Sequence, residues 1–381
     1  MHIVFIYDSI TWGGMQTWVY NLIKSLRGKS NKISWLYIYG EDFKNNYSET
    51  IDFSKIGKGY RGKDYIYRPW KLIAAIYDMV LFLKKNPTDL IISGSSLGSL
   101  IAGFSGRILN IPCFRILGND MEVSEPIIYN LYRICKFDIF IDRYFGVNAQ
   151  LNQLLKKGVK PHKLVNINNA VDTNYFYPFD KNKKLKIKSE LGYNQNDIII
   201  GWIGRIAINM QVKYTVKLFE KLYLKNPKIF KLLIVGGGPW LEELKVLISE
   251  KEFASSVQFL GWQPLEKINS YYNVMDFVPL LEKDPWGGSI VREAMAVGSI
   301  TISVDGISRV QKEFMNGEHA FLVSPNNFIE DSSNIIIELC KDKSKVEYIS
   351  KKAREYACKN LKFDLQAEII YQTFLKFVSK K

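Results

Sequence analysis

Short hydrophobic segments alternate with longer segments of helical periodicity along most of this chain, and that alternation limits its possible folds more than any other feature. A strand of a buried parallel sheet is a nearly continuous apolar run, and the chain must return through a helix before it can add the next parallel strand. We therefore predict an α/β fold with parallel sheets. The expected strands are residues 2–7, 33–39, 89–93, 112–117, 144–147, 164–167, 198–203, 232–235, 257–260, 277–280 and 300–304.

The expected strands form two series, and the sequence between them changes in character. Residues 172–186 are first aromatic and proline-containing and then rich in lysine, which indicates a boundary. A chain of 381 residues is long enough for two domains. We predict a doubly wound, Rossmann-like domain at residues 1–175, a second one at residues 176–362, and a C-terminal helix at residues 363–381.

Residues 284–298 read as a glycine-rich turn that opens a short helix, and they are the first candidate for a ligand site. Ser289 is the expected N-cap, and Gly298 is expected to end the helix. The first N–H groups of a helix lack partners within it and attract anions, and the two glycines before Ser289 would let a phosphate come close. Glu293, one turn into the helix, could accept hydrogen bonds from ribose hydroxyls. The segment favours a sugar nucleotide, and a surface helix after a glycine-rich lead-in is the alternative.

Further short motifs occur before this helix, and their order carries more information than any one of them. Residues 13–22 read as a glycine loop and a helix start, and residues 204–205 are a Gly-Arg pair after an expected strand. The other motifs are residues 169–178, 235–239 and 259–262. Together with the Glu-Ala-Met-Ala-Val-Gly of residues 293–298, they make the chain resemble family 4 of the GT-B glycosyltransferases over nearly its whole length.

This resemblance implies a GT-B fold, in which two Rossmann-like domains face a central cleft. The first domain would bind the acceptor and the second the donor, and the C-terminal helix would cross back to the first domain. The implied function is that of a retaining, hexosyltransferase-type enzyme, which moves a sugar from a UDP- or GDP-sugar to a saccharide or a polyprenyl-diphosphate-linked acceptor. The implied setting is the synthesis of a cell-envelope polysaccharide, such as an O-antigen or a capsule.

The resemblance also implies roles for individual residues. Arg205 would face the donor diphosphate, because a guanidinium is a planar, permanently charged partner for phosphate. Asp120, in a polar loop after an expected strand, could receive the proton of an acceptor hydroxyl, or it could merely cap a turn. The expected donor-binding residues are Gly13, Gly14, Gly204, Arg205, Gly236, Gly237, Asp284, Gly287, Gly288, Ser289, Ile290 and Glu293.

Three positions depart from the pattern of the family. Its first signature glutamate falls on Pro285, and Asp284, one position earlier, is a possible substitute. Its lysine falls on Met210, and Lys213 is the nearest replacement and a third catalytic candidate. The histidine that the family often carries in its first half is absent from residues 117–120. These departures keep an alternative open, namely a non-catalytic GT-B protein that binds a sugar nucleotide or scaffolds an envelope-assembly complex.

The sequence predicts neither a metal ion nor another cofactor. It contains no Asp-x-Asp motif, with which metal-dependent transferases of the other common fold hold a divalent ion. His2, His162 and His319 are too scattered to suggest a metal site. A nicotinamide site at residues 236–241 is not supported, because the third glycine of Gly-x-Gly-x-x-Gly would fall on Leu241.

Residues 55–71 interleave basic and aromatic side chains, and the whole chain carries a net charge of +14. Such a charge favours anionic partners, and this mixture of residues suits the interfacial layer of an anionic membrane. The expected membrane or acceptor contacts are Lys58, Arg61, Lys63 and Arg68, and a solvated loop is the alternative. Nucleic acid is suggested by the charge alone, because no nucleic-acid-binding module is recognised, and we expect none as a partner.

Other features favour a cytoplasmic protein that is attached peripherally to the inner face of the cytoplasmic membrane. No stretch has the roughly 18 consecutive apolar residues of a transmembrane helix. The N-terminus lacks the basic start and the cleavage site of a signal peptide. The cysteines show no metal-binding or redox spacing, as expected in a reducing cytosol. They are Cys113, Cys135, Cys340 and Cys358.

Overall fold

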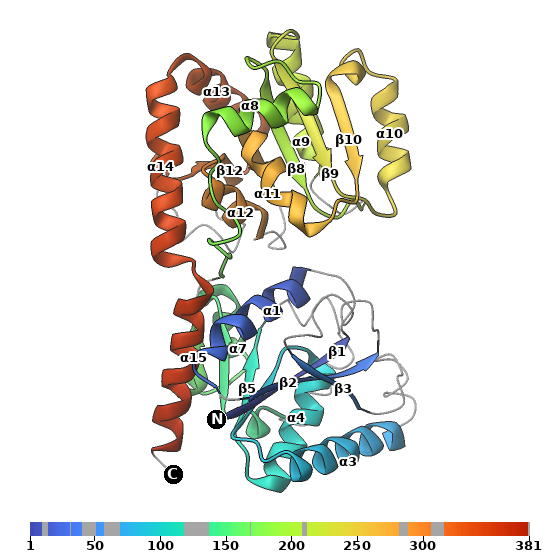
Figure 1. Ribbon diagram of the computed structural model, residues 1–381, viewed down its shortest axis with the longest axis vertical. Helices are drawn as coiled ribbons and strands as arrows, with labels where there is room; N and C mark the ends of the chain where they lie inside the picture. The colour runs from blue at the N-terminus through green and yellow to red at the C-terminus, as the bar shows by residue number, and fades with distance from the viewer. Residues whose placement is uncertain are drawn as a thin grey trace. The chain divides into compact units, whose positions relative to one another are not determined.

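The chain folds into two compact α/β units in the computed structural model (Figure 1). The first unit comprises Met1–Asn168 together with Phe363–Lys381, and the second comprises Asn169–Lys362. The structure describes residues 1–9, 14–30, 32–39, 51–56, 69–117, 137–167, 169–207, 212–281, 289–305 and 316–379.

The first unit is built on a parallel sheet of seven strands in the order β3-β2-β1-β4-β5-β6-β7. Its strands are β1 (His2–Ser9), β2 (Lys32–Tyr39), β3 (Asp52–Lys55), β4 (Leu90–Ser93), β5 (Cys113–Ile116), β6 (Arg143–Gly146) and β7 (Leu164–Asn166). Its helices are α1 (Gly14–Arg27), α3 (Pro69–Lys85), α4 (Ser96–Leu109), η2 (Phe137–Phe140), α7 (Asn148–Lys156), η3 (Pro161–Lys163) and α15 (Phe363–Val378). Helix α3 packs against α4, and α1 packs against α15.

The second unit repeats this plan with six parallel strands in the order β10-β9-β8-β11-β12-β13. Its strands are β8 (Ile198–Ile203), β9 (Phe230–Val235), β10 (Val257–Gly261), β11 (Phe277–Leu280), β12 (Ile300–Val304) and β13 (Phe321–Val323). Its helices are α8 (Lys181–Glu190), α9 (Val212–Lys225), α10 (Leu241–Ser249), η4 (Ala254–Ser256), α11 (Leu265–Val274), α12 (Ser289–Val297), α13 (Phe328–Lys341) and α14 (Lys343–Asn360).

The predicted strands are all present, and none of their ends differs from the prediction by more than two residues. Two strands at sheet edges, β3 and β13, were not predicted. Strand β3 has exposed or half-exposed side chains throughout, and β13 has only three residues. Strand β3 lacks the apolar run that identified the central strands, because an edge strand is buried on fewer sides. Strand β13 is apolar, but three residues are too short to form such a run.

The second unit begins earlier than the boundary expected at residue 176. The Val171 N–H donates to the Leu361 carbonyl oxygen at 2.7 Å, and Arg354 donates to the carbonyl oxygens of Phe176 and Thr173 at 2.7 and 3.1 Å. These bonds tie the aromatic segment to α14. The lysine-rich stretch that follows forms α8, whose N-cap Asp180 accepts a hydrogen bond from the Lys183 N–H at 2.9 Å.

The last helix, α15, returns to the first unit and packs on α1. The rings of Trp18 and Phe363 lie 5.8 Å apart, and Lys29 forms an ion pair with Glu368. No helix in the described parts of the chain is both long and apolar enough to cross a lipid bilayer.

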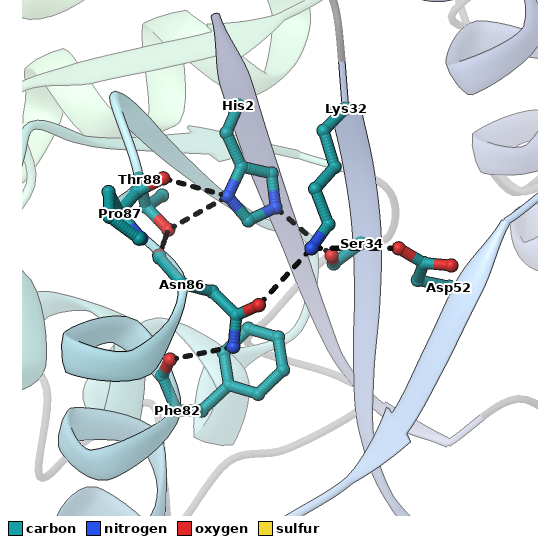
Figure 2. A network of polar contacts seen from close by, with 8 residues as sticks. All are labelled: His2, Lys32, Ser34, Asp52, Phe82, Asn86, Pro87 and Thr88. Atoms are coloured by element: carbon teal, nitrogen blue, oxygen red, sulfur yellow. Dashed lines mark hydrogen bonds and ion pairs between the residues drawn. The ribbon is translucent and has the colours of Figure 1, made fainter.

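A polar network joins the strands of the first sheet at their amino ends (Figure 2). The His2 ring lies 3.0 Å from the Pro87 carbonyl oxygen through Nδ1 and 3.0 Å from Ser34 Oγ through Nε2. Lys32 Nζ lies 3.9 Å from Asp52 Oδ2. Burial lowers the pKa of His2, which favours its neutral form. Both of its ring nitrogens already face protein oxygens, as expected of a core histidine.

A surface cavity of about 540 Å³ opens beside this network. It is lined by Lys32, Ser34, Ile51, Asp52, Phe53, Ser54, Phe82 and Asn86. Doubly wound sheets bind their ligands at the carboxyl ends of the strands, so this cavity lies at the wrong edge of its sheet for the predicted chemistry.

Candidate functional site

The candidate site lies at the carboxyl edge of the second sheet, where the strand order reverses. Strand β8 has β9 on one side and β11 on the other. Such a reversal of strand order is a topological switch point, and doubly wound sheets bind their ligands there. The loop after β8 contains Gly204 and Arg205, and the connection after β11 leads into α12.

Backbone hydrogen bonds join the loops after β8, β9 and β10. The Gly204 N–H donates to the Val235 carbonyl oxygen at 2.9 Å, and the Gly236 N–H donates to the Gly261 carbonyl oxygen at 2.8 Å. A Cβ atom at Gly236, where φ is +128°, would lie 2.0 Å from the Gly204 carbonyl oxygen. Gly236 is therefore required for the close approach of these loops.

Arg205 lies beside the first turn of α12. A Cβ atom at its neighbour Gly204 would lie 3.5 Å from Ile290 Cδ1, which places the β8 loop against that turn. Arg205 is exposed, and Ile290 is half-buried. In the described parts of the chain, Arg205 has neither a hydrogen bond nor an ion pair. Its guanidinium is therefore available to an anion from solvent.

Helix α12 begins at Ser289. Ser289 is therefore the first helical residue, whereas the sequence had predicted it as the N-cap. Gly298, with a φ of +83°, ends the helix as predicted. The first turn of α12 contains no acidic side chain that would compete with an anionic ligand.

Glu293 is half-buried one turn into α12, and its Oε2 atom accepts a hydrogen bond from the Tyr272 hydroxyl at 2.7 Å. Burial raises the pKa of Glu293 to about 7, although the Tyr272 hydroxyl and Arg292 oppose this shift. Tyr272 is itself fully buried in α11, and its ring packs edge-on against Phe176 at 5.7 Å. The carboxyl group is thus fixed in place, and near neutral pH it is only partly ionised.

Sequence reasoning missed two residues of this site. Tyr272 lies on a different helix from Glu293, and no local motif connects the two. Trp262 lies within a motif that was noticed, but its ring was given no role. That ring is 69% exposed, and its Nε1 atom would lie 2.5 Å from a Cβ atom at Gly237. Gly237 therefore lets an indole ring lie against the loop after β9.

The third catalytic candidate from the sequence is Lys213. It is the second residue of α9, and its Nζ atom lies 5.2 Å from the centre of the Tyr214 ring. No described contact joins it to Arg205 or to Glu293. Gly14 is the first residue of α1. The remaining predicted residues lie outside the described part of the chain, and they are Gly13, Lys58, Arg61, Lys63, Arg68, Asp120, Asp284, Gly287 and Gly288.

At the corresponding edge of the first sheet, the described start of α4 is already hydrogen-bonded to a protein carboxylate. Asp8, at the end of β1, is buried, and its Oδ1 atom accepts hydrogen bonds from the Gly98 N–H at 2.9 Å and from the Ser95 hydroxyl. Ser95 is the N-cap of α4. A carboxylate of the chain itself therefore occupies the start of this helix.

Two doubly wound parallel sheets in one chain define the GT-B fold, and solved structures of that fold superimpose on this chain. HepE from Anabaena, solved in complex with UDP-glucose, has a TM-score of 0.79 and 18% sequence identity, with 100% of both chains covered. This likeness establishes the fold. Residues 183–356 match the model of the glycosyl transferases group 1 family.

Two curated relatives are similar in sequence. The N-acetyl-alpha-D-glucosaminyl L-malate synthase of Bacillus anthracis is 26% identical over 272 residues, which are 68% of this chain and 67% of the relative. The alpha-monoglucosyldiacylglycerol synthase of Streptococcus pneumoniae is 26% identical over 127 residues, which are 33% of this chain and 29% of the relative.

Proposed function

We propose that this protein is a glycosyltransferase that takes its sugar from a nucleoside diphosphate sugar. The observation that carries this proposal is the juxtaposition of Arg205, the first turn of α12 and the half-buried Glu293 at the switch point of the second sheet. These groups match the two polar parts of such a donor. The cation and the helix start suit its diphosphate, and the carboxylate suits its ribose hydroxyls.

In the proposed reaction, the bond between the anomeric carbon of the sugar and the diphosphate oxygen breaks. The acceptor hydroxyl bonds to that carbon and gives up its proton, and the nucleoside diphosphate leaves with the bonding electrons. Arg205 stabilises the charge that gathers on the diphosphate, and this is the main electrostatic demand of the step. Asp120 is the proposed proton acceptor, and Lys213 is proposed as a second cation for the leaving group.

The same proposal includes four more specific features. The second unit binds the donor, and the first binds the acceptor. A uridine nucleotide is the favoured donor, because HepE was solved in complex with UDP-glucose. We also propose retention at the anomeric carbon and a reaction without a divalent ion, since Arg205 and a helix start can supply the positive charge that a metal would otherwise give.

The proposed acceptor is a saccharide or a lipid-linked saccharide at the inner surface of the cell membrane. The relative from Streptococcus pneumoniae is by name a synthase of a glucosyl diacylglycerol, so its product is a lipid. The net charge of +14 and the basic residues Lys58, Arg61, Lys63 and Arg68 support binding to an anionic membrane. The setting would be the synthesis of an envelope polysaccharide.

A panel of UDP- and GDP-sugars tests this function in two stages. A donor at about 100 times its dissociation constant should raise the free energy of unfolding by roughly 2.7 kcal/mol, which a thermal shift detects. The donor that stabilises the protein is then followed for release of nucleoside diphosphate. Binding with release supports an enzyme, and binding without release supports the non-catalytic alternative that Pro285 and Met210 suggest. If no nucleotide sugar binds, both readings are wrong.

A further inference from the structure

Helix α3 is apolar on both of its faces. Its buried face carries Ala75, Met79 and Leu83, which belong to the core of the first unit. Its opposite face carries a second apolar row, which we call the α3 stripe. The exposed fractions of its residues are 61% for Trp70, 67% for Ile73, 61% for Tyr77 and 38% for Leu81.

The spacing of the α3 stripe makes it one continuous surface. Its residues recur every three or four positions, so they share one side of the helix. A helix that is hydrophobic all round is normally buried on all sides, and a contiguous exposed apolar surface marks a place of interaction. In Figure 1, α3 lies at the outer edge of the first unit, beside α4. We therefore expect a binding partner or a lipid surface to cover the α3 stripe.

The residues around the α3 stripe point to a lipid surface. The helix ends in two exposed lysines, Lys84 and Lys85. Its only acidic residue, Asp78, lies about 100° round the helix from Tyr77, at the border of the α3 stripe. Aromatic rings with polar tips, aliphatic side chains and flanking lysines are the composition of helices that lie in a membrane interface. The excess of positive charge in the whole chain adds attraction to anionic lipids.

We propose that α3 lies on an anionic bilayer, with the α3 stripe inserted between the lipid headgroups and with Lys84 and Lys85 at the phosphates. This proposal gives the lipid-linked acceptor of the proposed function a physical basis, and it rests on that function only for its biological meaning. A protein partner is the competing occupant. It is less favoured because lysines are depleted in protein interfaces, whereas two close this surface.

The test uses the full chain and sedimentation with vesicles of phosphatidylcholine, with and without 30% phosphatidylglycerol. Ile73→Ser combined with Tyr77→Ser should weaken binding to the anionic vesicles at least tenfold, because it removes inserted apolar surface. Val246→Ser combined with Leu247→Ser is the matched control. These residues are 60% and 52% exposed on α10 of the second unit, and their replacement should leave binding unchanged.

The salt dependence of vesicle binding distinguishes the insertion of apolar side chains from charge attraction alone. Raising the ionic strength screens the lysines but leaves apolar insertion in place. The wild-type protein should therefore keep part of its vesicle binding at high salt, and the α3 variant should keep none. Equal vesicle binding by the wild-type protein and the α3 variant, or no binding by the wild-type protein, would overturn the proposal. Self-association that the α3 variant abolishes, without vesicle binding, would instead identify a second copy of the chain as the occupant.

Donor binding is measured separately, by thermal shift on the same proteins. A variant that loses vesicle binding but keeps nucleotide-sugar binding supports the membrane role of α3. A wild-type protein that binds vesicles but no nucleotide sugar leaves α3 as a membrane helix and removes the proposed enzymatic function. The two proposals can thus fail independently.

Discussion

The two sheets of this protein have the same kind of switch point, but the groups at their carboxyl edges differ. In the first sheet, the Asp8 carboxylate accepts hydrogen bonds from the Gly98 N–H and the Ser95 hydroxyl at the start of α4. In the second sheet, the corresponding helix, α12, has no acid in its first turn, and the exposed Arg205 lies on the neighbouring loop.

This difference separates a structural helix start from one that can serve a ligand. An N-terminus that already holds a carboxylate has little attraction left for a phosphate, whereas a free one beside a cation attracts it strongly. Identical topology therefore does not give identical function. In the proposed function, the side chains at the switch point would decide which unit binds the anionic donor.

The largest effect is expected at Arg205. Arg205→Ala should lower turnover at least about a hundredfold, because it removes a charge that stabilises the departing diphosphate. Lys213→Ala is the comparison variant, and it should have a smaller effect. Steady-state release of nucleoside diphosphate measures both. Near-normal turnover in Arg205→Ala with a large loss in Lys213→Ala would transfer the role to Lys213.

Glu293→Ala should raise the dissociation constant of the donor roughly 10- to 100-fold, since a hydrogen bond to a charged group contributes roughly 1.5–3 kcal/mol. Tyr272→Phe should give a smaller loss, because it frees the carboxyl from its fixed position without removing it. Titration calorimetry with the donor measures both variants. Unchanged affinity in Glu293→Ala would remove the ribose contact from this account.

The pH dependence of donor binding provides a second test of Glu293. Its carboxylate form is the better acceptor, so the affinity for the donor should fall as the pH falls through the pKa of about 7.

The free energy of unfolding should depend on pH in the opposite direction. The pKa is raised above its ordinary value of 4.5, so the contribution of this group to folding is present below pH 4.5 and is lost as the pH rises to about 7. Glu293→Gln should therefore melt at a higher temperature than the wild-type protein at pH 8, and it should flatten the pH profile of binding. A profile that is unchanged in Glu293→Gln would assign the titration to another group.

Replacing Asp8 tests the carboxyl edge of the first sheet. Asp8→Ala should lower the free energy of unfolding by roughly 2 kcal/mol, because it leaves buried donors without their acceptor. Donor affinity should remain the same. Asp52→Ala removes an exposed carboxylate from the same unit and should change stability by less than about 0.5 kcal/mol. Chemical denaturation measures these values. A loss of donor binding in a folded Asp8→Ala protein would mean that the first edge also serves the donor.

The smallest effect is expected from metal removal. Turnover in excess chelator should equal turnover without it, because the proposed charge stabilisation comes from Arg205 and the start of α12. Activity that disappears in chelator and returns with magnesium or manganese would contradict this.

Much of the fold could be predicted from the sequence, because central parallel strands are apolar throughout and leave an unambiguous pattern. Strand β3 left no such pattern, since it lies at a sheet edge with exposed side chains. Local motifs also located Gly204, Arg205 and Glu293. They could not reveal Tyr272 as the partner of Glu293, because that contact depends on the packing of α11 against α12. Nor could periodicity show which apolar face of α3 is exposed, since both faces have the helical spacing.

Hydrogen exchange of the full chain, with and without saturating UDP or GDP, tests the central claim most directly. The account predicts that the nucleotide slows exchange of the backbone amides at residues 204–207, 236–240 and 289–293, at the carboxyl edge of the second sheet. Residues 94–98, at the start of α4, should exchange at the same rate in both samples. Protection at residues 94–98 without protection at residues 289–293 would place the nucleotide on the first sheet and contradict the account.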